Sequence, residues 1–162
     1  MRRSARWFAL AAAVVIVDQL VKAIVLAFFA NRPPQVHVTD FFNLVLALNK
    51  GAAFSILRDA SGWQTPVLIV FALAAAVLVI VLIVRSPERR MLCTGLALIL
   101  GGAVGNVIDR MRLGHVIDFL DFHVAGWHWP AFNVADSAIT VGAALLILEG
   151  FMHHEGRPRA SL

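Results

Sequence analysis

Four long apolar stretches dominate this sequence and leave it few possible folds. The most uniform of them, Thr65–Val84, contains no charged residue, and about 20 apolar residues in a helix cross the hydrocarbon core of a bilayer. Because a bilayer accepts only helices and closed barrels, we expect an α-helical membrane protein. Its 162 residues, 60% of them hydrophobic, fit a single membrane domain over 1–162. The expected spans lie near residues 7–29, 65–84, 91–108 and 132–151.

The positions of the basic residues indicate how these spans are oriented. Lysine and arginine accumulate in cytoplasmic segments. If four helices alternate in direction, both termini and the short connection 85–90 lie on the cytoplasmic side, and residues 30–64 and 109–131 form two outer loops. This bias explains the net charge of +4 without a nucleic-acid partner. The basic residues on the cytoplasmic side are Arg2, Arg3, Arg6, Arg85, Arg89, Arg90, Arg157 and Arg159.

Both outer loops contain strand-forming and aromatic residues. Gln35–Leu48 is rich in strand formers, and His115–Phe122 again has the character of a strand that ends before Gly126 and Pro130. We therefore expect four transmembrane helices with a small β-rich platform on the outer side, resting on the outer leaflet. The aromatic residues that would gather at this interface are Phe41, Phe42, Trp63, Trp127 and Trp129.

Two carboxylates flank the start of the last apolar stretch. Asp118 lies before a tryptophan-rich loop, and Asp136 lies about one turn into the apolar helix. An ionisable group inside a span costs roughly 2.5–3.5 kcal/mol and therefore indicates a functional site. A second carboxylate near the same interface indicates a pair of the kind with which aspartic proteases activate water. The alternative is that Asp118 is a solvated loop residue and Asp136 caps a helix.

Further polar side chains reach the same outer depth from neighbouring segments. Asn106 and Arg110 share a helix face by their i,i+4 spacing, and Asn133 and Asp136 share one by their i,i+3 spacing. The segment Asn49–Phe54 adds an amide, a glycine and two alanines, which would let a ligand approach the backbone closely. This convergence at one depth is difficult to explain by packing alone.

In the first span, Asp18 and Lys22 lie four positions apart, so we expect them to form an ion pair on one helix face. The interpretation we favour is structural, with the pair fastening this span to its neighbours. The rival is a proton relay through Asp18, Lys22 and Asp136 in a small proton-coupled carrier or channel subunit. That rival predicts acidic groups spread through the depth of the bilayer, whereas most of them here gather at one interface.

The histidines offer another kind of site, but their spacing does not support it. His115, His123 and His128 could bind a metal together with Asp118, yet the spacings match no zinc motif and H-E-x-x-H is absent. The serines likewise lack the G-x-S-x-G context of a serine nucleophile. We therefore expect neither a metal nor a cofactor.

Five short motifs follow one another in order from the first expected span to the last, and two of them lie in the outer loops. They are Asp18-x-x-x-Lys22, Asn49-x-Gly51-Ala52-Ala53-Phe54, Gly105-Asn106-x-x-Asp109-Arg110, Val116-Ile117-Asp118-Phe119 and Phe132-Asn133-Val134-Ala135-Asp136-Ser137. Together they resemble the lipoprotein signal peptidase family (signal peptidase II). Each motif alone is weak, but five in order are highly specific. Lys50 departs from the family, which often has threonine there.

The resemblance implies an aspartic endopeptidase of the bacterial inner membrane. Such enzymes remove signal peptides from diacylglyceryl-modified prolipoproteins, cutting just before the lipid-bearing cysteine, and are inhibited by globomycin. The resemblance implies that Asp118 and Asp136 are the catalytic pair, working without a cofactor among membrane lipids. It also implies that Asp109 holds Arg110 or the loop in place. The residues expected to bind substrate or orient the site are Asn49, Gly51, Asn106, Asp109, Arg110 and Asn133.

Overall fold

The computed structural model describes residues 2–51 and 63–155. Within them, four helices and a four-stranded antiparallel sheet are present, and all four helices are long and apolar enough to cross a membrane. The expected helical membrane fold with a small sheet is therefore confirmed. The elements in chain order are α1 (Arg2–Phe29), β1 (Gln35–Thr39), β2 (Phe42–Asn49), α2 (Gln64–Arg85), α3 (Arg90–Leu113), β3 (Val116–Val124), β4 (Trp127–His128) and α4 (Val134–Glu155).

The helix ends differ from the expected spans where local chemistry decides them. Helix α3 continues past residue 108 to Leu113 and stops at Gly114, whose φ of 77° is left-handed. Asp109 and Arg110 therefore lie in a helix and not in the outer loop to which we assigned them. Helix α4 begins after Asn133, whose side-chain oxygen accepts the Asp136 backbone N–H at 2.9 Å, as an N-cap does.

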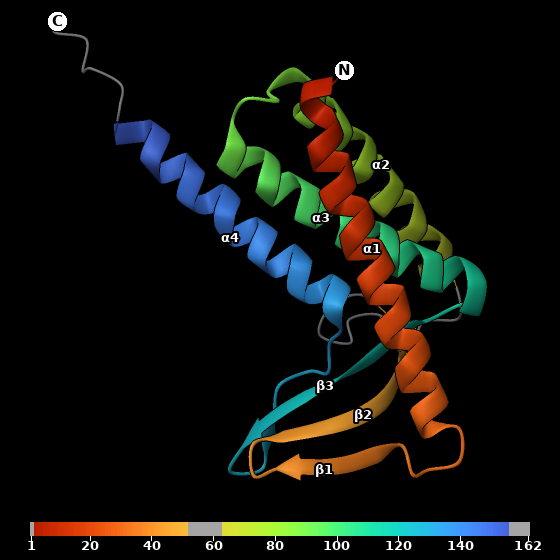
Figure 1. The fold of residues 1–162 in the computed structure, drawn as a ribbon. Helices are drawn as coiled ribbons and strands as arrows, with labels where there is room; N and C mark the ends of the chain where they lie inside the picture. Colours follow the sequence, from red (N-terminus) through yellow and green to blue (C-terminus); the bar gives the residue numbers. More distant parts are fainter. Residues whose placement is uncertain (1, 52–62, 156–162) are drawn as a thin grey trace, which may run out of the picture.

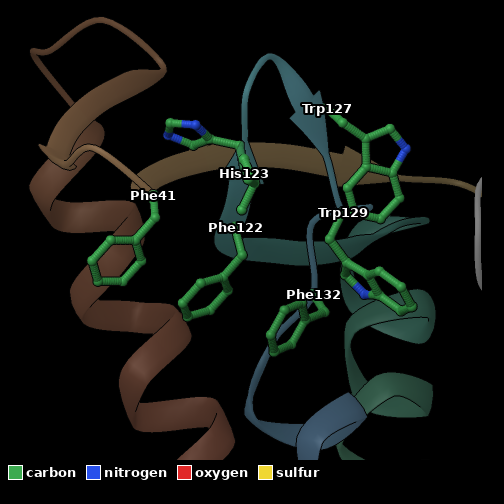
Figure 2. Close-up of a pocket in the computed structure, with 7 residues that line it drawn as sticks. Phe41, Phe122, His123, Trp127, Trp129 and Phe132 are labelled. Atoms are coloured by element: carbon green, nitrogen blue, oxygen red, sulfur yellow. The ribbon is translucent and has the colours of Figure 1, made fainter.

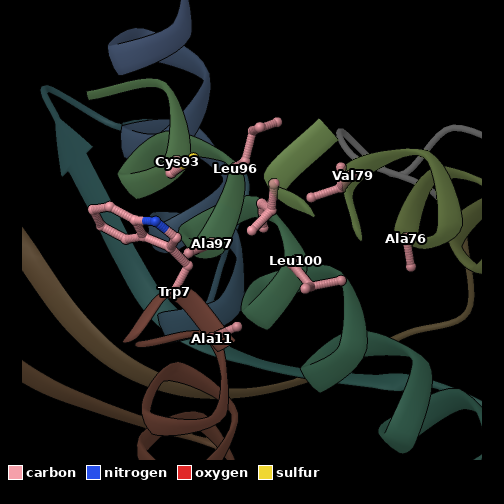
Figure 3. Packing of buried hydrophobic residues seen from close by; sticks show 9 residues of the cluster. Trp7, Ala11, Ala76, Val79, Cys93, Leu96, Ala97 and Leu100 are labelled. Atoms are coloured by element: carbon pink, nitrogen blue, oxygen red, sulfur yellow. The ribbon is translucent and has the colours of Figure 1, made fainter. Parts of the chain in front are cut away.

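Helices α1, α2 and α3 share an apolar core around Trp7, Val79 and Leu100 (Figure 3). Helices α3 and α4 approach closely because glycine faces the partner backbone. A Cβ at Gly102 would collide with the Ala135 carbonyl, and one at Gly105 would lie 2.8 Å from Asp18 Oδ2. Small residues of this kind are how membrane helices come into contact, and here they also bring α1 and the start of α4 together.

The sheet lies beyond one end of the helices, in the order β1-β2-β3-β4 (Figure 1). Strands β2 and β3 pair so that Asn49 faces Val116 and Ala47 faces Asp118. Aromatic side chains are exposed at the sheet, where Phe41 is 56% and Trp127 is 61% exposed. The predicted strands are thus present, and β3 extends past Phe122 to Val124.

At the opposite end, the start of α1 contacts the connection between α2 and α3 (Figure 1). Trp7 Nε1 donates to the Pro87 carbonyl at 3.0 Å, and Arg3 pairs with Glu88 at 3.0 Å. Basic residues of two segments expected on the cytoplasmic side therefore lie together, on the side of the helices away from the sheet.

Candidate active site

Asn133 lies at the centre of a polar cluster where β3 meets α3 and α4. Its side chain is fully buried, and its Nδ2 lies 2.7 Å from Asp118 Oδ1, 3.2 Å from the Ile117 carbonyl and 3.3 Å from Asn106 Oδ1. Because its oxygen also accepts the backbone N–H of Asp136, this one amide joins the Asp118 carboxylate to the first turn of α4.

Asp118 is 2% exposed on β3. Its Oδ2 accepts a hydrogen bond from Asn49 Nδ2 at 3.0 Å, while Asn133 serves its other oxygen. Burial, followed by the nearby charge of Asp136, raises the pKa of Asp118 from 3.8 to about 7. The hydrogen bonds from Asn49 and Asn133 oppose this shift without cancelling it. Asp118 is thus a buried strand residue, and the alternative of a solvated loop carboxylate is wrong.

Asp136 lies in the first turn of α4 and borders a cavity of about 660 Å³. Its Oδ1 accepts a hydrogen bond from Asn106 Nδ2 at 2.7 Å. Among the other lining residues are Asn49 and Arg110 on the polar side and Trp129 and Phe132 on the apolar side. The cavity can therefore hold a ligand with both an extended backbone and apolar groups next to Asp136.

Arg110 and Gly51 form a second side of this cluster. Arg110 Nη2 donates to the Gly51 carbonyl at 2.9 Å, and the Gly51 N–H donates to Asn49 Oδ1 at 2.9 Å. The buried Arg110 Nε has no hydrogen-bond partner among the residues described. Asn49, Gly51 and Arg110 thus form one chain of contacts that ends on Asp118. The Ala52, Ala53 and Phe54 positions of the same motif lie outside the described residues.

Behind this cluster, Lys22 forms two ion pairs inside the protein. Its Nζ lies 2.8 Å from Asp18 Oδ2 and 2.7 Å from Asp109 Oδ2, and all three side chains are almost fully buried. Lys22 also donates to Asn106 Oδ1 at 3.2 Å. Since the Asn106 oxygen faces the ammonium, its Nδ2 faces Asp136, and the lysine thereby orients a group that touches the site.

The same acidic residues also contact segments that follow them in the chain. Asp18 Oδ1 accepts the Ala135 N–H at 2.9 Å, so α1 holds the first turn of α4. Asp109 accepts the Ile117 N–H at 3.2 Å and pairs with Lys22. In the described part of the chain Asp109 therefore holds the start of β3, as one of the two expected roles requires, but does not pair with Arg110.

Gln19 is a member of this network that sequence reasoning missed. Its Nε2 donates to Asp109 Oδ1 at 2.8 Å and to the Gly105 carbonyl at 3.3 Å. The available signal was a polar side chain directly after Asp18 in an otherwise apolar helix.

The histidines do not join Asp118. His128 Nδ1 lies 2.9 Å from Asp121 Oδ1, and the His123 and His128 rings stack with centroids 4.8 Å apart. Within residues 2–51 and 63–155, no group of three or more histidine, cysteine, aspartate or glutamate side chains is arranged to hold a metal ion.

Comparisons with known proteins show the family and the fold of this chain. The family model described as "Signal peptidase (SPase) II" matches residues 10–152. The chain is 55% identical over 145 residues to a "Lipoprotein signal peptidase" of Paraburkholderia phymatum, covering 90% of this chain and 87% of that protein. It is 51% identical over 143 residues to a protein of the same name from a Janthinobacterium species, covering 88% and 86%.

A solved structure has the same fold. It is titled a "Bacterial membrane enzyme structure", superposes with a TM-score of 0.82 at 27% sequence identity, and the match covers 98% of this chain and 94% of that one. A second structure with a similar title gives a TM-score of 0.75 at 28% identity. The chain is thus similar to these proteins in sequence and in fold over nearly its whole length.

Proposed function

The chain belongs to the signal peptidase II family, a family of proteases that cleave prolipoprotein signal peptides, and from this premise we propose that Asp118 and Asp136 are its catalytic pair. The observation that carries the proposal is that Asn133 binds the Asp118 carboxylate and the Asp136 backbone N–H, and so holds both residues together beside a cavity. The carrier or channel interpretation is set aside, because the family hydrolyses peptides.

The pair holds one proton near neutral pH. Two close carboxylates do not readily ionise together, and burial raises the pKa of Asp118 to about 7, which favours Asp118 as the member that retains the proton. Asp136 borders the cavity and, when ionised, takes a proton from the water that attacks the scissile carbonyl. Asp118 polarises that carbonyl and passes its proton to the leaving amine. Acid and base are both supplied by side chains of this chain.

The neighbouring polar groups bind and orient the substrate. Arg110 and Asn49 line the cavity beside the carboxylates and offer N–H donors to a peptide backbone. Asn106 and Asn133 set the direction of the carboxylate oxygens. The apolar side of the cavity takes the lipid-modified part of a diacylglyceryl prolipoprotein, and globomycin competes for the same space.

Cleavage of a lipid-modified substrate peptide by the purified protein, with and without globomycin, tests the function. Asp118→Asn and Asp136→Asn each should lower turnover by at least about 10³-fold, because asparagine keeps the shape but cannot exchange the proton. Each variant should still be recovered folded and inserted. Near-normal turnover by either one removes that residue from the catalytic role.

We further propose that the protein lies in the bacterial inner membrane with both termini in the cytoplasm and the sheet in the periplasm. The joined basic segments at the end away from the sheet support this orientation. In that orientation Asp136, one turn into α4, lies near the outer interface. A substrate can then keep its acyl chains in the outer leaflet while its peptide bond reaches the pair.

Cysteine accessibility tests this orientation once the single native cysteine is replaced by Cys93→Ala, which also serves as the unlabelled control. Cysteines introduced singly at exposed positions of 116–136 should react with impermeant thiol reagents from outside the cell membrane. Those at 85–90 should react only from the cytoplasmic side. The reverse pattern contradicts the orientation and the substrate route together.

A further inference from the structure

One side of the cavity at Asp136 is formed by residues 129–132, which connect β4 to α4 and are called the cavity wall below. The wall follows β3 in an extended course. The Trp129 N–H donates to the Phe122 carbonyl at 2.8 Å, and the Phe132 N–H donates to the Leu120 carbonyl at 3.1 Å. Its far end is fixed by Asn133, which belongs to the polar cluster.

The cavity wall begins directly after β4, and this strand is too short to be held in place by its backbone hydrogen bonds to β3 alone. Strand β4 has two residues and follows a tight turn in which Ala125 has a φ of 50° and Gly126 a φ of 82°. Besides its backbone pairing with β3, β4 is fastened by the side chain of His128, whose Nδ1 lies 2.9 and 3.0 Å from the two oxygens of Asp121.

Asp121 is well placed to serve as this anchor. It is 7% exposed on β3 and accepts a second hydrogen bond from Asn43 Nδ2 at 2.8 Å. Burial acts to raise the pKa of Asp121, but the hydrogen bonds from Asn43 and His128 and the charges of His128 and His123 lower it below its usual value. The anchor therefore remains an ionised acceptor, and the ring of His123 stacks on that of His128.

The side chain next to His128 reaches the substrate cavity. Trp129 lines the cavity at Asp136 and also an apolar hollow of about 390 Å³ beneath the sheet. In this hollow Trp127 and Trp129 lie edge to face, and Phe122 stacks on Phe132 (Figure 2). A shift of β4 would therefore move an aromatic group of the wall, while Asp118 stays fixed by Asn49 and Asn133.

We infer that His128 is a positioning residue for substrate binding: by fastening β4 to Asp121 it holds Trp129 and the cavity wall in place. It acts on the affinity for the lipid-modified peptide and not on the proton transfers. The inference rests on cleavage of prolipoproteins by this chain, but not on which carboxylates catalyse it.

Steady-state cleavage of a lipid-modified prolipoprotein peptide in detergent micelles tests this role with three variants. His128→Ala should raise KM about fivefold, the loss of one hydrogen bond to a charged group at a half-exposed site, with kcat within about twofold of the original protein. His128→Asn should keep KM within about twofold, because its amide can donate to Asp121 from nearly the position of Nδ1. An unchanged KM in His128→Ala, or an equal defect in His128→Asn, overturns the inference.

His115→Ala is the matched control. His115 lies just before β3 at the same end of the protein and makes no hydrogen bond to the part of the chain that the structure describes. Its KM and kcat should both stay unchanged. A rise in KM equal to that of His128→Ala would show a general effect of losing a histidine here and would contradict the specific role.

Hydrogen–deuterium exchange of the same proteins separates this inference from the proposed catalytic pair, because it needs no turnover. Amides of 127–132 should exchange faster in His128→Ala than in His128→Asn, while those of β2 stay unchanged. Equal exchange overturns the inference even if the enzyme is active. Should His128→Ala not be recovered folded, His128→Leu removes the same hydrogen bond while keeping more of the side-chain volume, and normal KM and exchange in that variant would likewise overturn it.

Discussion

Two sets of carboxylate side chains lie in one hydrogen-bonded network at the start of α4, and they differ in whether a cation contacts them. In the first, the lysine cluster, Asp18 and Asp109 both lie within 2.8 Å of the Lys22 ammonium. In the second, the carboxylate pair, Asp118 and Asp136 receive hydrogen bonds from asparagine amides. Asp18, Asp109 and Asp118 are buried and Asp136 is partly buried beside the cavity. Among residues 2–51 and 63–155, only the first set has a cation within ion-pair distance of its carboxylates.

This difference separates a structural role from a reactive one. A buried carboxylate in contact with an ammonium stays ionised and joins the elements that supply its partners. Without such contact, burial and the charge of Asp136 raise the pKa of Asp118 to about 7, where a proton can be both held and released. Asn106 connects the two groups, accepting from Lys22 and donating to Asp136. The lysine cluster thus orients the pair without neutralising it.

Removing one carboxylate of the lysine cluster gives the largest expected effect. Asp18→Ala leaves the Ala135 N–H without its acceptor and removes one of the two carboxylates that balance the charge of Lys22. The free energy of unfolding should fall by about 3 kcal/mol. Asp18→Asn keeps an oxygen for the Ala135 N–H and should cost less. Thermal unfolding in detergent and the yield of folded protein measure both. Equal stability of the two variants contradicts a structural role, and a loss of turnover without loss of stability would move Asp18 into the active site.

A smaller effect is expected from the carboxylate pair, with a defined dependence on pH. The pKa of Asp118 is higher in the folded protein than its ordinary value of 3.8. Its contribution to stability is therefore fully present below pH 3.8 and is lost as pH rises toward 7. Asp118→Asn does not titrate, so its melting temperature relative to the original protein should be about 5–10 °C more favourable at pH 8 than at pH 5. A difference independent of pH would show that Asp118 titrates normally.

Much of the fold could be predicted because membrane spans are encoded in local composition. The apolar stretches were long enough to identify each helix, and strand formers marked β2 and β3. The ends were harder, since they depend on single residues: Gly114 stops α3 beyond the apolar stretch, and Asn133 starts α4 after Phe132 has paired with Leu120.

The site could be predicted only within each segment. Helical spacing placed Asn106 and Arg110 on one face, but it does not say which neighbouring helix that face meets. The partners of Asp109 and the contact of Asp18 with the Ala135 N–H follow from how α1, α3 and α4 pack, so sequence reasoning missed them. Alternation along β3 likewise places Asp118 and Asp121 on opposite faces, which separates the histidines from Asp118. The catalytic role of Asp118 and Asp136 stays a prediction.

The protonation state of the two groups tests the central claim most directly. Infrared difference spectra between pH 5.5 and pH 8.5 should show the C=O stretch of a protonated carboxyl group that disappears as pH rises through about 7. That signal should be absent in Asp118→Asn and retained in Asp18→Asn, since the carboxylates around Lys22 are held in ion pairs with it. A signal that survives Asp118→Asn but is lost in Asp18→Asn would place the proton in the lysine cluster and contradict the account.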